Sequence, residues 1–125
     1  MKIFLSLLIS FFFVSIAKAE TQFFETLYDI PKMSQMVEYS GEGFLFDKAD
    51  GRLATAKASI EESPEEIIDF YKTALYQMGW AQINQKPNFI SFIRKNEKIT
   101  ISIEKTEAYE VSGNIVSFEI SPLAQ

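Results

Sequence analysis

Hydrophobic and polar residues alternate at two different periods along this chain, and each period predicts a type of element. Between Ser63 and Trp80 the apolar side chains recur every three or four residues, which is the spacing of one helix face. Ser63 can cap the first free amides, Pro64 suits the first turn, and Glu66 completes a capping box. Gly79 offers a left-handed stop. We therefore predict one helix here.

Alternation at every second residue predicts strands on both sides of this helix. The segments 43–47 and 52–60 flank a turn at residues 48–51 with the signal Asp50-Gly51, and predict a hairpin. After the helix, strands are predicted from Trp80 and at 89–94, 98–105 and 115–121, with a polar loop at 106–114. The order ββαβββ or ββαββββ indicates a single α+β domain. We expect an antiparallel sheet of about five to six strands with the helix packed on one face.

One face of the segment 52–60 carries the small side chains Ala54, Ala56 and Ala58. A row of alanines leaves room for a bulky element, so we expect the helix to pack on this strand. The alternative is a ligand pocket between the helix at 63–79 and the strand at 52–60.

Residues 1–19 have the pattern of a signal peptide. Lys2 supplies a positive start, an apolar run extends from Ile3 to Ile16, and Ala17-Lys18-Ala19 has small residues where a signal peptidase reads. The run is shorter than the roughly 20 apolar residues of a bilayer span, although an uncleaved anchor is the alternative. We expect cleavage after Ala19, no stable membrane span afterwards, and a periplasmic location rather than full secretion.

Residues 20–42 predict an N-terminal arm that precedes the α+β domain of residues 43–125. Pro31 disfavours a continuous helix in this region, so we expect an extended arm that lays its apolar side chains on the domain. In the alternative, Tyr28, Met33 and Met36 form an exposed contact surface for another molecule.

Composition removes several classes of function. The chain has 12 basic and 17 acidic residues, and loss of Lys2 and Lys18 with the signal leaves ten basic residues and a net charge of −7. This acidity argues against nucleic-acid binding. Cysteine and histidine are both absent, which excludes disulfides, thiol nucleophiles, histidine bases and typical zinc sites. We expect no catalytic residue, no metal and no cofactor.

The remaining candidates for chemistry are carboxylates and one arginine around the predicted hairpin turn. Asp47 and Asp50 have the spacing of a plain turn, and a calcium site or an acid and base pair is the alternative. Arg52 suits a carboxylate or phosphate ligand, but an internal pair with Asp47 or Asp50 is the simpler interpretation. Tyr71 and Trp80 suit stacking on a sugar or aromatic ligand, and buried packing with a hydrogen-bonded tip is the simpler interpretation.

Several short motifs between Asp29 and Trp80 are similar to those of a group of small uncharacterised exported bacterial proteins. The motifs are Asp29-Ile30-Pro31 with Met33, Phe46-Asp47-Lys48, Gly51-Arg52, and the helix motif Phe70-Tyr71, Leu75 and Gly79-Trp80. The chain differs from the group at Tyr76, where a proline often follows the leucine. The resemblance implies an exported domain and assigns no catalytic residue.

Three functions are consistent with these patterns. The first is a non-enzymatic exported domain that binds an envelope protein or serves as an accessory subunit, through sheet edges and the arm. The second is a small-molecule carrier with its site near Tyr71 and Trp80. The third is a carboxylate-dependent hydrolase that uses Asp47 and Asp50. Binding residues are therefore sought among Tyr28, Met33, Met36, Arg52, Tyr71 and Trp80.

Overall fold

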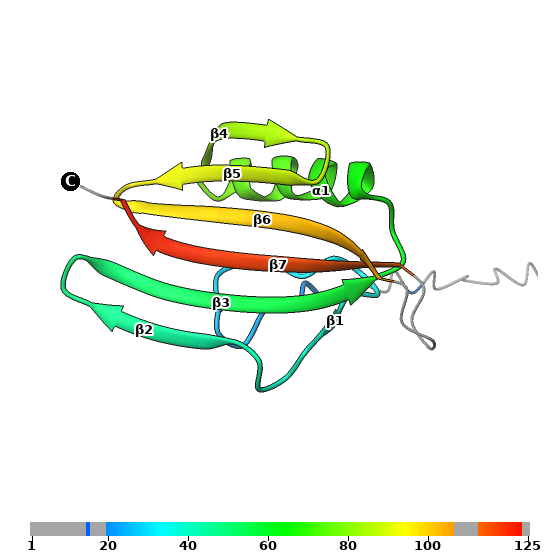
Figure 1. Ribbon diagram of the computed structural model, residues 1–125, viewed down its shortest axis with the longest axis horizontal. Helices are drawn as coiled ribbons and strands as arrows, with labels where there is room; N and C mark the ends of the chain where they lie inside the picture. Colours follow the sequence, from blue (N-terminus) through cyan, green and yellow to red (C-terminus); the bar gives the residue numbers. More distant parts are fainter. Residues whose placement is uncertain (1–14, 16–19, 107–112, 124–125) are drawn as a thin grey trace, which may run out of the picture.

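The computed structural model describes residues 15, 20–106 and 113–123. The predicted signal peptide, apart from Ser15, and most of the predicted loop at 106–114 lie outside these residues. The described chain forms one α+β unit (Figure 1). Its elements are β1 (Val37–Glu38), β2 (Phe44–Lys48), β3 (Gly51–Ile60), α1 (Pro64–Gln77), β4 (Ala81–Lys86), β5 (Phe89–Arg94), β6 (Glu97–Thr106) and β7 (Gly113–Pro122).

All seven strands belong to one antiparallel sheet with the order β1-β3-β7-β6-β5-β4. One side of β3 pairs with β7, and its other side is shared by β2 and β1. The predicted number of about five to six strands is too low. The missed strand is β1, which has only two residues and lies inside the predicted arm, where no alternation is long enough to detect.

The helix and the first hairpin form where local signals predict them. Helix α1 begins at Pro64, and the Ser63 hydroxyl accepts a hydrogen bond of 3.2 Å from the backbone N–H of Glu66. After α1, Gly79 adopts a φ of +89°, the left-handed conformation that favours glycine. In the hairpin, β2 and β3 pair from Phe44 with Thr55 to Lys48 with Gly51.

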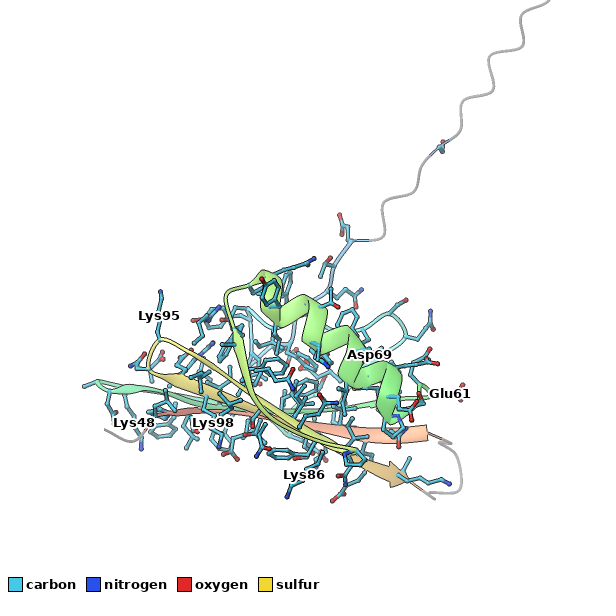
Figure 2. The ribbon with its side chains drawn as sticks, turned by 90° about the horizontal axis from the view of Figure 1, so that it is seen from above. Lys48, Glu61, Asp69, Lys86, Lys95 and Lys98 are labelled. Carbon is cyan, nitrogen blue, oxygen red and sulfur yellow. The ribbon has the colours of Figure 1, made fainter. Side chains whose placement is uncertain are left out.

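One face of the sheet, here called the inner face, carries the core. Ile67, Ile68, Tyr71 and Leu75 of α1 are buried, as are Phe24, Leu27, Ile30 and Met36 of the arm. In Figure 1, α1 lies behind β4 and β5, whereas the arm lies behind β3 and β7. Figure 2 shows α1 on one side of the sheet and Lys98 on the opposite side, here called the outer face. The inner face is therefore covered by two elements.

This arrangement corrects the expected packing of the helix on the alanine strand. Ala54, Ala56 and Ala58 are buried, but β7 and β6 separate β3 from β5 in the sheet. The arm takes the space beside β3, and the Thr26 hydroxyl donates a hydrogen bond to the carbonyl of Thr55. Small side chains therefore accommodate the arm, whose hydrophobic residues gave no regular pattern in the sequence.

Phe118 of β7 lies where the two covering elements meet. Its ring centroid is 4.6 Å from that of Phe24 in the arm and 5.2 Å from that of Tyr71 in α1. Within the sheet, Phe118 pairs with Ala56 on one side and Ile101 on the other. One aromatic side chain thus connects arm, helix and sheet.

Within residues 20–106 and 113–123, the single helix α1 has 14 residues and is neither long nor apolar enough to cross a bilayer.

Candidate functional site

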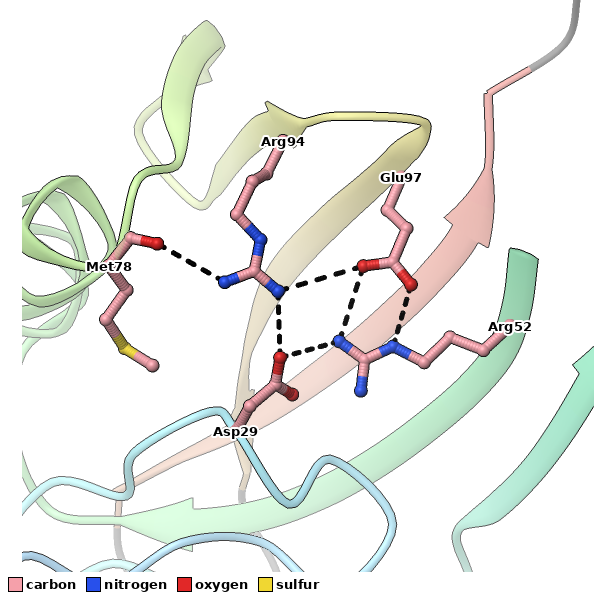
Figure 3. Close-up of polar contacts among 5 residues, drawn as sticks. All are labelled: Asp29, Arg52, Met78, Arg94 and Glu97. Atoms are coloured by element: carbon pink, nitrogen blue, oxygen red, sulfur yellow. Dashed lines mark hydrogen bonds and ion pairs between the residues drawn. The ribbon is translucent and has the colours of Figure 1, made fainter. Parts of the chain in front are cut away.

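Four charged side chains gather at one end of the inner face. The preceding cross-strand row is apolar and runs from Ala54 through Ile120 and Ile99 to Phe92. Two residues further along three of these strands, the same alternation places Arg52, Glu97 and Arg94. Asp29 of the arm joins them (Figure 3). We call Asp29, Arg52, Arg94 and Glu97 the charged cluster.

The charged cluster is electroneutral and paired within itself. Arg52 Nη2 lies 2.8 Å from Asp29 Oδ2, and Arg52 Nε lies 2.9 Å from Glu97 Oε1. Arg94 Nη2 lies 2.9 Å from the same Asp29 oxygen, while its Nη1 donates to the carbonyl of Met78 at 3.3 Å. These contacts connect the arm, three strands and the end of α1. The chain has only two arginines, and both belong to this cluster.

Burial and the neighbouring charges shift the pKa values of Asp29 and Arg52 in opposite directions. Burial alone would raise the pKa of Asp29, but hydrogen bonds from Arg52 and Arg94 lower that pKa below its usual value. Burial alone would lower the pKa of Arg52, and its hydrogen bonds to Asp29 and Glu97 raise that pKa above the usual value. Both partners therefore stay ionised at neutral pH.

We expect acid to weaken the attachment of the arm through Asp29. Its lowered pKa means that ionised Asp29 stabilises the fold above the unfolded pKa of about 3.9. This contribution is lost as pH falls through the still lower pKa of the folded state. Asp29→Asn should therefore be less stable than wild type at pH 7, and the difference should narrow as the pH falls below about 3.9, as measured by urea unfolding.

The control for this test is Asp47→Asn, because Asp47 is an exposed aspartate outside the hydrogen bonds of the cluster. Its difference from wild type should be small at both pH values. A stability difference for Asp29→Asn that stays constant from pH 7 to pH 3 would contradict the assignment.

Three of the residues singled out in the sequence lie in or beside this cluster. Arg52 is buried, and its guanidinium carbon is 5.2 Å from the ring centroid of Tyr28, which is exposed. Arg94 stacks on the buried Trp80, with 4.4 Å between its guanidinium carbon and the ring centroid. The prediction that Arg52 pairs with Asp47 or Asp50 is wrong, because its partners Asp29 and Glu97 are distant in sequence.

The other three candidate residues lie where the arm packs on α1. Tyr71 is buried, and its hydroxyl donates to the carbonyl of Pro31 at 2.9 Å and contacts the sulfur of Met36 at 3.6 Å. Met36 is also buried, and Met33 is partly buried against the core. An exposed surface made of Tyr28, Met33 and Met36 is therefore not formed. These residues hold the arm in place.

A polar hollow of about 330 Å³ adjoins the charged cluster. It is lined by all four cluster residues together with Tyr28, Asp47, Lys48, Ala49, Gly51 and Asn96. Asp29 Oδ1 and Arg52 Nη1 are buried without a hydrogen-bond partner among the described residues. A charged ligand would have to compete with the pairs already made in the cluster. We therefore interpret the cluster as an anchor for the arm.

The structure gives little support to the hydrolase and to the small-molecule carrier. The backbone carbonyl of Asp50 accepts a hydrogen bond of 2.9 Å from Asn96, and the described residues contain no group of three acidic side chains suited to a metal ion. A cavity of about 1010 Å³ opens between the start of α1 and the β4–β5 turn. Its lining includes Pro64, Asp69 and Lys86 but none of the alanines beneath which a carrier site was expected.

The most unusual surface of the described chain is strand β2. All five of its residues are exposed, and three consecutive ones are large and apolar: Phe44, Leu45 and Phe46, with exposed fractions of 46, 39 and 64%. We call these three residues the exposed strip. On its other side β2 has no strand partner among the described residues, and in Figure 1 it runs along the edge of the sheet.

Sequence reasoning predicted this segment as the first strand of a hairpin but did not identify its apolar residues as exposed. The signal was present in the run of three apolar residues, because a half-buried strand would alternate apolar and polar residues instead.

Comparisons of the chain with protein-family models, with curated proteins and with solved structures find no match.

Proposed function

We propose that this chain is a non-enzymatic, protein-binding component of the cell envelope, exported by its leader and retained in the periplasm. The export part rests on the pattern of residues 1–19. The binding part rests on the exposed strip, because long apolar edge strands invite pairing with another chain and proteins ordinarily blunt them. That single feature carries the proposal.

The two edges of the sheet differ in how well a further strand could pair with them. Strand β4 has a register shift between Gln82 and Asn84, and such a bulge interrupts the regular row of backbone donors and acceptors. Its only large apolar residue is Ile83. Strand β2 pairs with β3 at five consecutive positions without a shift. The β2 edge is therefore the better template for strand addition.

The expected occupant is an extended strand of a partner protein. Directly paired residues share a face, so Leu45 lies with Ala54 on the inner side, and Phe44 and Phe46 lie with Thr55 and Leu53 on the outer side. A partner strand with apolar residues on both faces would cover the strip. Backbone hydrogen bonds would supply affinity, and the two phenylalanines would select the side chains.

Selection from a displayed library of extended peptides tests this proposal on the purified chain. The enriched peptides should carry apolar residues opposite the strip, and Phe46→Ser should weaken their binding about tenfold or more, as for an aromatic hot spot. The matched control is Tyr76→Ser, which removes another exposed aromatic side chain, on α1. Failure to enrich any peptide, or equal weakening by both variants, would reject β2 as the binding surface.

A further inference from the structure

We propose that the strand that covers β2 is the β2 of a second copy of this chain, so that two sheets join across a twofold axis. This inference rests on the proposed function, because it needs β2 to be a binding edge, and it adds the identity of the partner. The argument depends on which side chains face one another when β2 pairs with itself in the antiparallel direction.

A twofold axis at Leu45 makes β2 self-complementary. Residues whose numbers sum to 90 then face each other, so Phe44 of one copy pairs with Phe46 of the other, and Leu45 pairs with its own equivalent. One step further out Gly43 faces Asp47, and two steps further out Glu42 faces Lys48 of the second copy on both sides of the axis. Glu42 is exposed and directly precedes Gly43. Figure 2 shows Lys48 on the outer side. Glu42 lies at a bend two residues before β2, so this ionic pair requires the pairing of the two copies to extend beyond Phe44.

These pairs are the ones that stabilise antiparallel strands. Aromatic pairs and opposite charges are favourable when directly opposed, and like charges are unfavourable. The three apolar and two ionic pairs form without moving the strand within its own sheet. The self-pairing therefore uses each exposed side chain of β2 from Phe44 to Phe46 together with its two flanking charges.

Neighbouring registers lack this complementarity. An axis at Phe46 would place Asp47 opposite Leu45, and an axis at Phe44 would place Glu42 opposite Phe46. If the axis lay between two residues, a residue whose backbone N–H and C=O point away from β3 would face one whose groups point toward β3. Such registers do not align donors with acceptors, because the orientation alternates with a period of two residues. Among registers close to the middle of β2, the axis at Leu45 alone pairs apolar with apolar and acid with base.

Charge reversal provides the first test, with sedimentation of the purified chain as the measurement. The wild-type chain should form a dimer whose dissociation constant rises about tenfold in Glu42→Lys and in Lys48→Glu, because each change opposes like charges at two places. The double variant exchanges the two charges and should return the constant to near the wild-type value. Asp69→Lys, on α1, is the control for a change in net charge and should leave the dimer intact.

A cysteine substitution provides the second test, because the chain contains no cysteine of its own. Paired residues in an antiparallel ladder lie within the range that a disulfide spans, whereas residues two positions apart lie beyond about 7 Å. Leu45→Cys should therefore give a covalent dimer under mild oxidation. Phe46→Cys, whose equivalents are diagonal to each other in this register, should give much less.

The outcomes separate this inference from the proposed function. A dimer that responds to charge as described and cross-links through position 45 supports both. Self-pairing is wrong if the chain remains monomeric, or if the dissociation constant of the dimer does not change when the charges of Glu42 and Lys48 are reversed. If such a chain still selects peptides that depend on Phe46, the protein-binding function stands and its partner is a different protein. If neither occurs, both proposals fail.

Discussion

Arg52→Met is expected to lower the free energy of unfolding by about 3–5 kcal/mol, the cost of removing one partner from a buried ion pair. The side chain of Arg52 is only 6% exposed, and its loss would leave Arg94 as the one remaining arginine beside the two carboxylates Asp29 and Glu97. Methionine keeps most of the volume, so the change removes the charge and its hydrogen bonds. Urea unfolding followed by the fluorescence of Trp80, the single tryptophan, measures the effect.

The control for Arg52→Met is Lys57→Met in the same strand. Lys57 is exposed, so its substitution should change stability by no more than about 0.5 kcal/mol. The double variant Asp29→Asn/Arg52→Met should be more stable than the sum of the two single effects predicts, because both single changes remove the same contact between Asp29 and Arg52. Equal stabilities for Arg52→Met and Lys57→Met would show that the charged cluster does not anchor the arm.

Phe118→Ala is expected to lower the free energy of unfolding by about 3–5 kcal/mol, through lost burial and the cavity left behind. The ring is 2% exposed and contacts Phe24 of the arm and Tyr71 of α1, so neither element can move into the space without losing other contacts. Thermal and urea unfolding both measure the loss.

Tyr76→Ala is the matched control for Phe118→Ala, because it also truncates an aromatic side chain but at a position that is 78% exposed. Its effect should lie within about 0.5 kcal/mol. If Phe118→Ala were as mild as this control, the arm and α1 would not share a core at β7, and the arrangement of the inner face would need revision.

The proposed export and protein binding require no active site. Histidine and cysteine, which serve in most catalytic sites, are absent from the sequence. The carboxylates of Asp29 and Glu97 are engaged in ion pairs with Arg52. An edge strand with an apolar strip is useful only when another strand covers it. In a monomer the same strip would promote aggregation.

Local patterns in the sequence determined most of the secondary structure. The helix of residues 64–77, the hairpin of β2 and β3 and the alternating strands β5, β6 and β7 each lie where their periodicity and turn residues predict. These elements can be predicted from the sequence because helix caps, turns and the alternation of apolar residues depend on residues that are close together in the chain. Strand β1 was missed because two residues carry no detectable period.

The tertiary structure decided which element covers which strand and which charges pair. Asp29 lies 23 residues from Arg52 and 65 from Arg94 along the chain, and no local signal links them. The arm's hydrophobic residues have no period, so the sequence could not show that they cover the alanines beside α1. Exposure of β2 was likewise decided by the sheet order, which leaves β2 at an edge.

The sequence by itself therefore determined every element except β1, the acidic cysteine-free composition and the shortage of catalytic residue types. Only the folded chain decided that Arg52, Tyr71 and Trp80 are buried in packing and anchoring contacts, and that the apolar strip of β2 is exposed. The physical reason is the range of the interactions. Hydrogen bonds of helices and turns join near neighbours, whereas burial and ion pairing depend on where distant segments meet.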